Sequence, residues 1–137
     1  MSETIRVAEY FYLHSPDRPG EAAHLLGALR DAGVNLLALS GFPQGRRAQV
    51  DLVPEDPAAL RAAAKRAGWK LTGPKKVFLV TGDDRVGAMT ELAERLAAAK
   101  VNIVATQAVA TGSGSYGAIL WVAPRDVKKA GKALGAV

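Results

Sequence analysis

Apolar side chains follow two different spacings along this 137-residue chain, and each spacing predicts one type of secondary structure. Residues 5–13 (IRVAEYFYL) are rich in β-branched and aromatic side chains, as is typical of a strand. After a short polar loop, apolar residues recur every three or four positions, which predicts an amphipathic helix that ends at Gly33. The apolar residues of this helix are Ala22, Leu25, Leu26, Leu29 and Ala32.

The same two patterns continue along the chain and predict strands that alternate with helices. In the first half, strands are expected at 34–42, 47–53 and 69–73, and helices are expected from Pro19 and over 57–67. In the second half, strands are expected at 76–81, 101–110 and 116–122, and helices at 85–99 and 124–134. Helices interspersed with hairpin-connected strands predict an α+β fold, in which helices cover one face of an antiparallel sheet. The split βαβ (ferredoxin-like) order βαββαβ fits best.

Two loop sequences occur twice, at a constant offset of 67 residues. Residues 17–20 (DRPG) align with 84–87 (DRVG), and residues 34–36 (VNL) align with 101–103 (VNI). Because the apolar helix positions between these loops align at the same offset, the chain is expected to be a tandem repeat of two modules, 1–73 and 74–137. Few residues follow the final helix, so the second module is expected to lack its last strand.

The repeated pattern of D-R-P-G, an apolar helix and G-V-N before a strand resembles the ACT domain, a small regulatory module. The first copy reads DRPGEAAHLLGALRDAGVNLLAL and the second DDRVGAMTELAERLAAAKVNIVAT, so the resemblance covers nearly the whole chain. The second copy departs from the motif, because Val86 stands in place of the Pro and Lys100 in place of the Gly. The resemblance implies allosteric binding of a free amino acid at an interface between two modules, and it implies no catalysis by the module.

The repeated loops carry groups that are suited to bind a small zwitterion. The first turn of a helix presents unpaired N–H groups that favour a carboxylate, and a glycine such as Gly20 or Gly87 lets a ligand approach closely. An Asn amide can donate to a carboxylate and accept from an ammonium group, and an aspartate can pair with the ammonium. The first module supplies the candidates Ser15, Asp17, Arg18, Pro19, Gly20, Asn35 and Leu36. The second module supplies Asp84, Arg85, Gly87, Asn102 and Ile103.

Each of these residue types also has a purely structural interpretation. Asp17 and Asp84 could cap the helices that follow them. Gly20 and Gly87 could serve only close packing. Asn35 and Asn102 could simply adopt the backbone conformation required after the end of a helix. Ser15 could bond the turn instead of a ligand. If a ligand binds, the first loop is expected to be the better site, because it keeps Pro19 and its helix ends at Gly33.

Composition and charge narrow the function further. The net charge is +5 and the pI about 9.7, but the basic residues are scattered and only 6% of residues are aromatic, which disfavours nucleic-acid binding. The chain has no Cys, and His14 and His24 stand outside any cluster with metal-ligand spacing, so no metal or other cofactor is expected. No catalytic triad or carboxylate pair can be assembled, which argues against an enzyme. No membrane-spanning run or signal peptide is found, so a cytoplasmic protein without membrane contact is expected.

Two classes of function remain compatible with these features. The leading hypothesis is a non-catalytic sensor of a free amino acid or a similar small zwitterion. The alternative is a protein-interaction module or regulatory subunit that docks on a metabolic enzyme, because residues 5–13 carry apolar side chains on both faces of one strand. Without a fourth strand in the second module, residues 76–81 (KVFLVT) would form a free apolar edge. Such an edge predicts either that the strand at 69–73 is shared between the repeats or that a second molecule pairs with it, and the resemblance favours a homodimer.

Overall fold

The computed structural model describes residues 3–137, which divide into two compact units. The first unit is Glu9–Lys75, and the second unit consists of residues 3–8 together with Lys76–Val137. This division differs from the expected modules 1–73 and 74–137 mainly at the N-terminus, because residues 3–8 form part of the second unit. The beginning of the chain therefore completes the unit that the C-terminal half builds.

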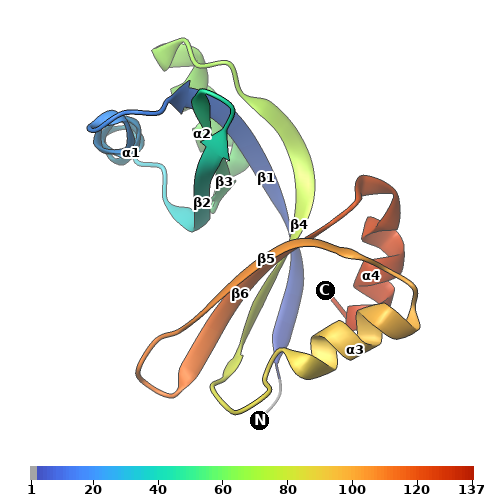
Figure 1. The fold of residues 1–137 in the computed structure, drawn as a ribbon. Coiled ribbons are helices and arrows are strands. Elements are labelled where there is room, and N and C mark those ends of the chain that lie inside the picture. Colours follow the sequence, from blue (N-terminus) through green and yellow to red (C-terminus); the bar gives the residue numbers. More distant parts are fainter. Residues whose placement is uncertain (1–2) are drawn as a thin grey trace. The chain divides into compact units, whose positions relative to one another are not determined.

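The strands and helices follow the predicted order, and the α+β class is confirmed (Figure 1). The first unit contains most of β1 (Thr4–Pro16), α1 (Glu21–Asp31), β2 (Leu36–Gln44), β3 (Arg47–Pro54), α2 (Pro57–Ala67) and the start of β4 (Thr72–Asp83). The second unit contains the start of β1, the rest of β4, α3 (Thr90–Ala98), β5 (Ile103–Ala110), β6 (Ser115–Val122), a 3₁₀ turn at Pro124–Asp126 and α4 (Val127–Leu134).

The strands are hydrogen-bonded in the order β2-β3-β1-β4-β6-β5. Strand β4 therefore has a neighbour on each side, and the prediction that residues 76–81 form a free edge is wrong. Residues 4–8 of β1 take the place of a fourth strand in the second unit. The backbone there also pairs with Val137, whose N–H donates to Ile5 O and whose carbonyl accepts from Val7 N–H, both at 3.0 Å. The second module is thus completed by a strand from the N-terminus.

The short strand predicted at 69–73 is instead the beginning of the long strand β4. This strand starts at Thr72 and continues through Pro74, where the pattern predicts a strand end. Proline lacks the N–H that a central strand position needs. Strand β6 pairs with β4 only from Phe78 onward, so Pro74 lies in a stretch that needs hydrogen bonds on one side only. A single strand can therefore serve both units.

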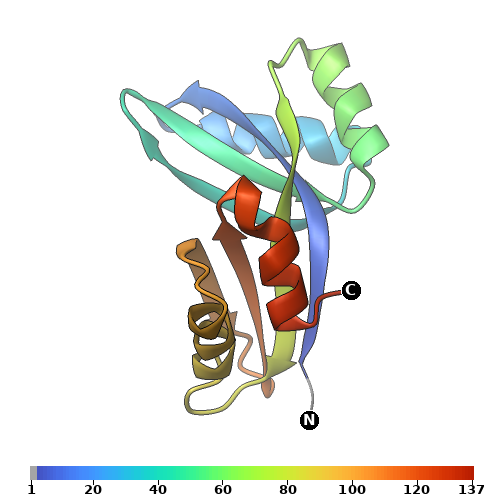
Figure 2. The same cartoon turned by 90° about the vertical axis from the view of Figure 1, so that its right-hand side faces the viewer.

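Each unit has its own hydrophobic core between its sheet and its helices. Helices α1 and α2 pack together in the first unit, and α3 and α4 pack together in the second (Figure 2). Ile5 of β1 belongs to the second core. The other central core residues are Phe11, Leu25, Leu29 and Val34 in the first unit and Phe78, Leu92, Leu96 and Val101 in the second. These two sets are related by the 67-residue offset, so the repeated sequence pattern is a repeated core.

The backbone also repeats where the first helix of each unit turns into the next strand. Gly33 has a φ of 72° and Lys100 has a φ of 61°. The N–H of the following residue bonds to Leu29 O in the first unit and to Leu96 O in the second, both at 2.9 Å. This left-handed conformation suits glycine but costs a residue with a side chain about 1 kcal/mol. Lys100 therefore occupies a glycine position of the repeat.

Both of these helices begin later than the patterns predict. Helix α1 begins at Glu21 rather than at Pro19, because Gly20 has a φ of 91° and cannot continue a helix. Helix α3 also begins late, at Thr90, because residues 86–89 form a turn. The loop after the first strand of each module is therefore longer than expected, and it leaves more backbone exposed near the helix start.

Candidate functional site

The first unit contains a cavity of about 370 Å³ beside the first loop of the repeated motif. It is bounded by the end of β1 and the loop after it, by the first turns of α1, and by the hairpin that joins β2 to β3 (Figure 1). All of these segments belong to the first unit. Small-molecule sites have volumes of roughly 300–1,000 Å³, so the cavity suits a ligand at the small end of that range.

The walls of the cavity are mainly apolar. Leu25 and Leu26 come from α1, on the face that the helix turns toward its sheet. Leu39 and Pro43 come from β2, and Leu39 is 45% exposed. Val50 of β3 completes this wall. Covering exposed apolar side chains is favourable in proportion to the area removed from water, so the walls favour a ligand with apolar surface.

Four polar side chains stand at the rim of the cavity, and all of them come from the loop after β1 or its immediate neighbours. They are Ser15, Asp17, Arg18 and Glu21. Arg18 Nε donates to Glu21 Oε1 at 2.8 Å, so these two charges compensate each other. The Asp17 carboxylate makes no hydrogen bond or ion pair with any residue in the described part of the chain. The rim therefore offers one unpaired negative charge.

The backbone at the start of α1 leaves donors without partners. No side chain caps α1, so the interpretation of Asp17 as a helix cap is wrong. Within residues 3–137, the N–H groups of Ala22 and Ala23 have no hydrogen-bond acceptor. Helix α2 differs, because the Asp56 side chain accepts from Ala58 N–H at 3.0 Å. Unpaired first-turn N–H groups and the helix dipole together favour an anionic group at this end of α1.

The structure brings together only part of the predicted site of the first module. Ser15, Asp17 and Arg18 line the cavity. Pro19 and Gly20 lie in the same loop, between these residues and α1, but do not line the cavity. The loop half of the predicted site is therefore present beside the cavity.

Asn35 and Leu36 lie at the opposite end of α1 from the cavity. The helix has 11 residues and so spans about 16 Å. Asn35 Nδ2 donates to Glu55 Oε2 at 3.5 Å, and Glu55 N–H donates to Asn35 O at 2.9 Å. Asn35 and Asp17 of the same unit therefore do not border the same cavity. Within the first unit, these two hydrogen bonds connect the residue before β2 to the residue after β3.

The second loop has a different environment. Asp84 N–H donates to Gly114 O at 3.0 Å, which attaches this loop to the β5–β6 hairpin. Asp84 does not cap α3, whose start has no side-chain cap. A Cβ at Gly87 would lie 3.3 Å from Thr90 Oγ1, so close packing favours a glycine there. These contacts agree with the structural interpretation of Gly87.

The remaining candidates of the second module are spread over its surface. Arg85 Nη2 lies 3.7 Å from Glu91 Oε2, and both side chains are largely exposed. Asn102 and Ile103 follow α3 at its other end, as Asn35 and its neighbour follow α1. The second module thus repeats the separation between the loop and the start of the second strand.

Sequence reasoning missed the side of the cavity that the β2–β3 hairpin supplies. Leu39, Gly41 and Phe42 all line the cavity from β2. A Cβ at Gly41 would meet no atom within 4 Å, and its φ is not left-handed, so neither packing nor a turn requires glycine there. A glycine inside a strand, here between Ser40 and Phe42, indicates close approach by other atoms. This signal in the segment 39–42 could have identified the site.

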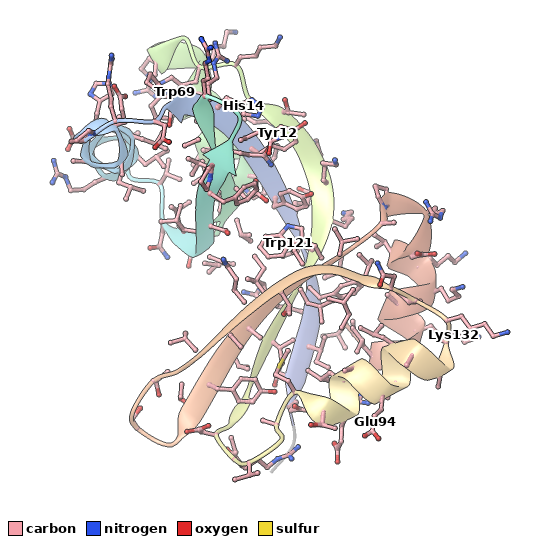
Figure 3. All side chains as sticks on the ribbon, viewed as in Figure 1. Tyr12, His14, Trp69, Glu94, Trp121 and Lys132 are labelled. Atoms are coloured by element: carbon pink, nitrogen blue, oxygen red, sulfur yellow. The ribbon has the colours of Figure 1, made fainter. Side chains whose placement is uncertain are left out.

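A second group of polar side chains lies on β1, β3 and β4 of the first unit. Tyr12 and His14 lie on β1 with their ring centroids 5.7 Å apart (Figure 3). Asp51 is 5% exposed and accepts from Gln49 Nε2 at 2.9 Å. Burial raises the pKa of the Asp51 carboxyl, while the Gln49 hydrogen bond and the charges of Lys75 and His14 act in the opposite direction. Residues 3–137 contain no group of His, Cys, Asp and Glu that could hold a metal ion, and no helix there could span a membrane.

At the level of sequence, no protein-family model and no curated protein matches the chain. In structure, the chain is similar to protein BT0572 from Bacteroides thetaiotaomicron, with a TM-score of 0.81, 18% identity and coverage of 96% of this chain and 88% of that chain. It is also similar to the ligand-free regulatory subunit of aspartate kinase from Thermus thermophilus (TM-score 0.66, 18% identity, 98% and 95% coverage). The regulatory subunit from Thermus flavus gives a TM-score of 0.60 at 19% identity, with 98% and 94% coverage. The chain has the fold of these regulatory subunits, with two ferredoxin-like α+β modules in tandem.

Proposed function

We propose that the chain is a regulatory protein that binds a free amino acid in the cavity at the start of α1 and has no catalytic activity of its own. The observation that carries this proposal is the cavity itself, in which an unpaired carboxylate and free backbone N–H groups stand beside apolar walls. A free amino acid presents an ammonium, a carboxylate and a side chain, which match these three features. The similarity in fold to regulatory subunits of aspartate kinase supports the regulatory role.

The polar ends of the ligand have complementary partners around the cavity. The α-carboxylate would accept a hydrogen bond from the N–H group of Ala22, which lines the cavity at the positive end of the helix dipole. The α-ammonium would pair with Asp17 at the rim. Charge-assisted hydrogen bonds of this kind are about twice as strong as neutral ones. None of these groups needs to gain or lose a proton, as expected for recognition without catalysis.

Asn35 and Asn102 enter this proposal in a different way from the loops. Each lies at the far end of the helix that follows its own loop. Either residue could contact a ligand only if that ligand is held by the loop of another module, which is the interface arrangement that the resemblance to ACT domains implies. Asn35→Ala therefore separates the two arrangements, because it weakens binding only at an interface site.

The direct test is a thermal-shift and calorimetric titration of the full chain with each of the twenty amino acids. A ligand at 100 times its dissociation constant should stabilise the protein by about 2.7 kcal/mol. Asp17→Asn should weaken binding about tenfold or more, because it removes the charge that faces the ammonium. Asp31→Asn is the matched control, since Asp31 lies at the other end of α1. If no amino acid shifts the melting temperature, the proposal is refuted.

One further observation favours a docking role or self-association beside ligand binding. Strand β5 has β6 as its only hydrogen-bonded neighbour in the described sheet, and its sequence IVATQAVA has no charge. Val104 and Val109 on this strand are 60% and 68% exposed. An uncharged edge strand of this kind pairs readily with another strand. We propose that β5, rather than residues 76–81, mediates a homodimer or the contact with a metabolic enzyme.

Light scattering distinguishes these assembly states. A homodimer through β5 should give a mass near twice 14.3 kDa at micromolar concentration, and Val109→Lys should convert it to a monomer. A monomeric wild type that copurifies with an enzyme only when Val109 is intact would favour the docking role. A monomeric wild type without any Val109-dependent partner would contradict both.

A further inference from the structure

We infer that the ligand of the cavity is an amino acid with an aliphatic side chain, of the kind found in leucine, isoleucine, valine or methionine. This inference rests on the proposed function, since it names the ligand class of the same site. It follows from how polar and apolar groups are distributed around the cavity. All charged lining residues belong to the loop after β1 and the first turn of α1. The hairpin side presents Leu39, Pro43 and Val50.

A ligand held by its polar ends at the loop must place its side chain against the hairpin and the apolar face of α1. Leu25 and Leu26 line this space from α1, and Leu39 and Pro43 line it from β2. An amide or charged ligand side chain would lose hydration against these walls without gaining a hydrogen bond, which is unfavourable. An aliphatic side chain loses only unfavourable contact with water.

The charges at the rim also disfavour a second ionised group on the ligand. Arg18 is already paired with Glu21 at 2.8 Å, so no free cation awaits an acidic side chain. Asp17 is the unpaired carboxylate among the lining residues, and the α-ammonium of the ligand would use it. A lysine or arginine side chain would therefore have no partner of its own. The rim suits one ammonium and one carboxylate.

Gly41 provides a way to close the apolar part of the cavity without disturbing the fold. A Cβ at Gly41 would meet no atom within 4 Å, and the backbone there is an ordinary strand conformation. Gly41→Val should therefore be tolerated, since valine favours strands, while its side chain occupies space at the hairpin wall. The equivalent position at the 67-residue offset is Ala108, which is exposed on β5. Ala108→Val is the matched control outside the cavity.

The experiment is calorimetric titration of the full-length wild type, Gly41→Val and Ala108→Val with leucine, isoleucine, methionine, alanine, threonine, aspartate and lysine. We expect leucine, isoleucine or methionine to bind about 10- to 100-fold more tightly than alanine, because each buried methylene contributes about fourfold. Gly41→Val should weaken this binding at least tenfold, and Ala108→Val should leave it within twofold of the wild type.

The results separate the ligand class from the proposed function. Tightest binding of threonine, aspartate or lysine, or leucine binding that Gly41→Val leaves unchanged, would overturn the aliphatic class while amino-acid binding stands. Binding of no amino acid at all would overturn the proposed function and the class with it. If thermal melting shows that Gly41→Val is unfolded, Leu39→Gln replaces it, because Leu39 is 45% exposed and a polar side chain there is compatible with folding. Leu39→Gln should also weaken leucine binding and spare alanine binding.

Discussion

Substituting Ile5 tests whether the N-terminal segment stabilises the second unit. Ile5 begins the first repeat in sequence but is 6% exposed in the core of the second unit, together with Phe78, Leu92 and Leu96. Ile5→Ala removes three buried carbon groups, and at about 0.8 kcal/mol each this costs about 2.4 kcal/mol. The cavity left behind raises the expected loss to about 2–5 kcal/mol. This loss should fall on α3 and α4 rather than on α1 and α2.

Native-state hydrogen exchange resolves this prediction because it reports the opening free energy of each helix separately. A loss of 2.4 kcal/mol corresponds to about 50-fold lower amide protection, which should appear in α3 and α4. Leu13→Ala is the matched control, since Leu13 lies on the same strand and is 5% exposed in the first core. It should lower protection mainly in α1 and α2. The two variants thus perturb one strand and two different cores.

Two results would refute this reasoning. If Ile5→Ala lowers protection in α1 and α2 more than in α3 and α4, Ile5 does not stabilise the second unit. If Ile5→Ala and Leu13→Ala both lower protection equally in all four helices, the two cores do not unfold separately. In that case the cores act as one cooperative unit, and stability arguments must treat the chain as a whole.

Four further substitutions test local features. Lys100→Gly should raise the free energy of unfolding by about 1 kcal/mol, because it removes a side chain from a position with φ of 61°. Gly33→Ala should lower the free energy of unfolding by a similar amount, because it adds a side chain at the equivalent position. Urea denaturation that does not show these two opposite shifts would contradict the backbone strain. Burial raises the pKa of Asp51, so its contribution to stability is full below about pH 4 and is lost as the pH rises through the folded-state pKa. Asp51→Asn should therefore gain stability relative to the wild type toward neutral pH. A difference in unfolding free energy between the two proteins that does not change with pH would contradict this. Tyr116 donates to Glu3 at 2.6 Å, and burial together with this bond raises the pKa of Tyr116 to about 12. Tyr116→Phe should lower the free energy of unfolding by about 1–3 kcal/mol below about pH 10, and by progressively less toward pH 12. An absorbance titration of the wild type that shows no tyrosine ionising near pH 12 would contradict this prediction.

The features that could be predicted from the sequence depend on local signals. Helix α2 is expected over 57–67 and observed at Pro57–Ala67, because Asp56 caps its start, Pro57 suits its first turn and Gly68 ends it in a left-handed conformation. The offset of 67 residues is likewise visible in sequence, and it recurs in the backbone at Gly33 and Lys100. Such signals need no knowledge of distant parts of the chain.

The pairing of residues 4–8 with the second unit could not be predicted from such local signals. Strand β1 runs without interruption over Thr4–Pro16, and its strand-forming residues continue through Ala8 and Glu9, where the two units divide. No local break marks this division. The choice of pairing partner depends on β4, more than sixty residues away, and such non-local pairings are not encoded in any short window of sequence.

The site was predicted in its loop half and missed in its hairpin half for a related reason. Strands β1 and β2 are both antiparallel to β3, so they are parallel to each other and their last residues lie at the same end of the sheet. That end carries Asp17 and the segment 39–42, whereas Asn35 precedes β2 and lies at the other end. Asp17 and Asn35 belong to one sequence motif, but the strand topology places Asp17 at the same end of the sheet as the last residues of β2.

Strand β1 is divided between the two units. Ser15 and Pro16 at the end of β1 line the cavity, and Ser15 pairs with Ala48 of the hairpin, which lines it too. The beginning of the same strand supplies Ile5 to the second core and pairs there with Val137. The ligand proposed for this cavity would therefore contact a strand that the second unit shares. Regulation requires that binding at one place change the free energy of another, and in this chain a single continuous strand connects the two.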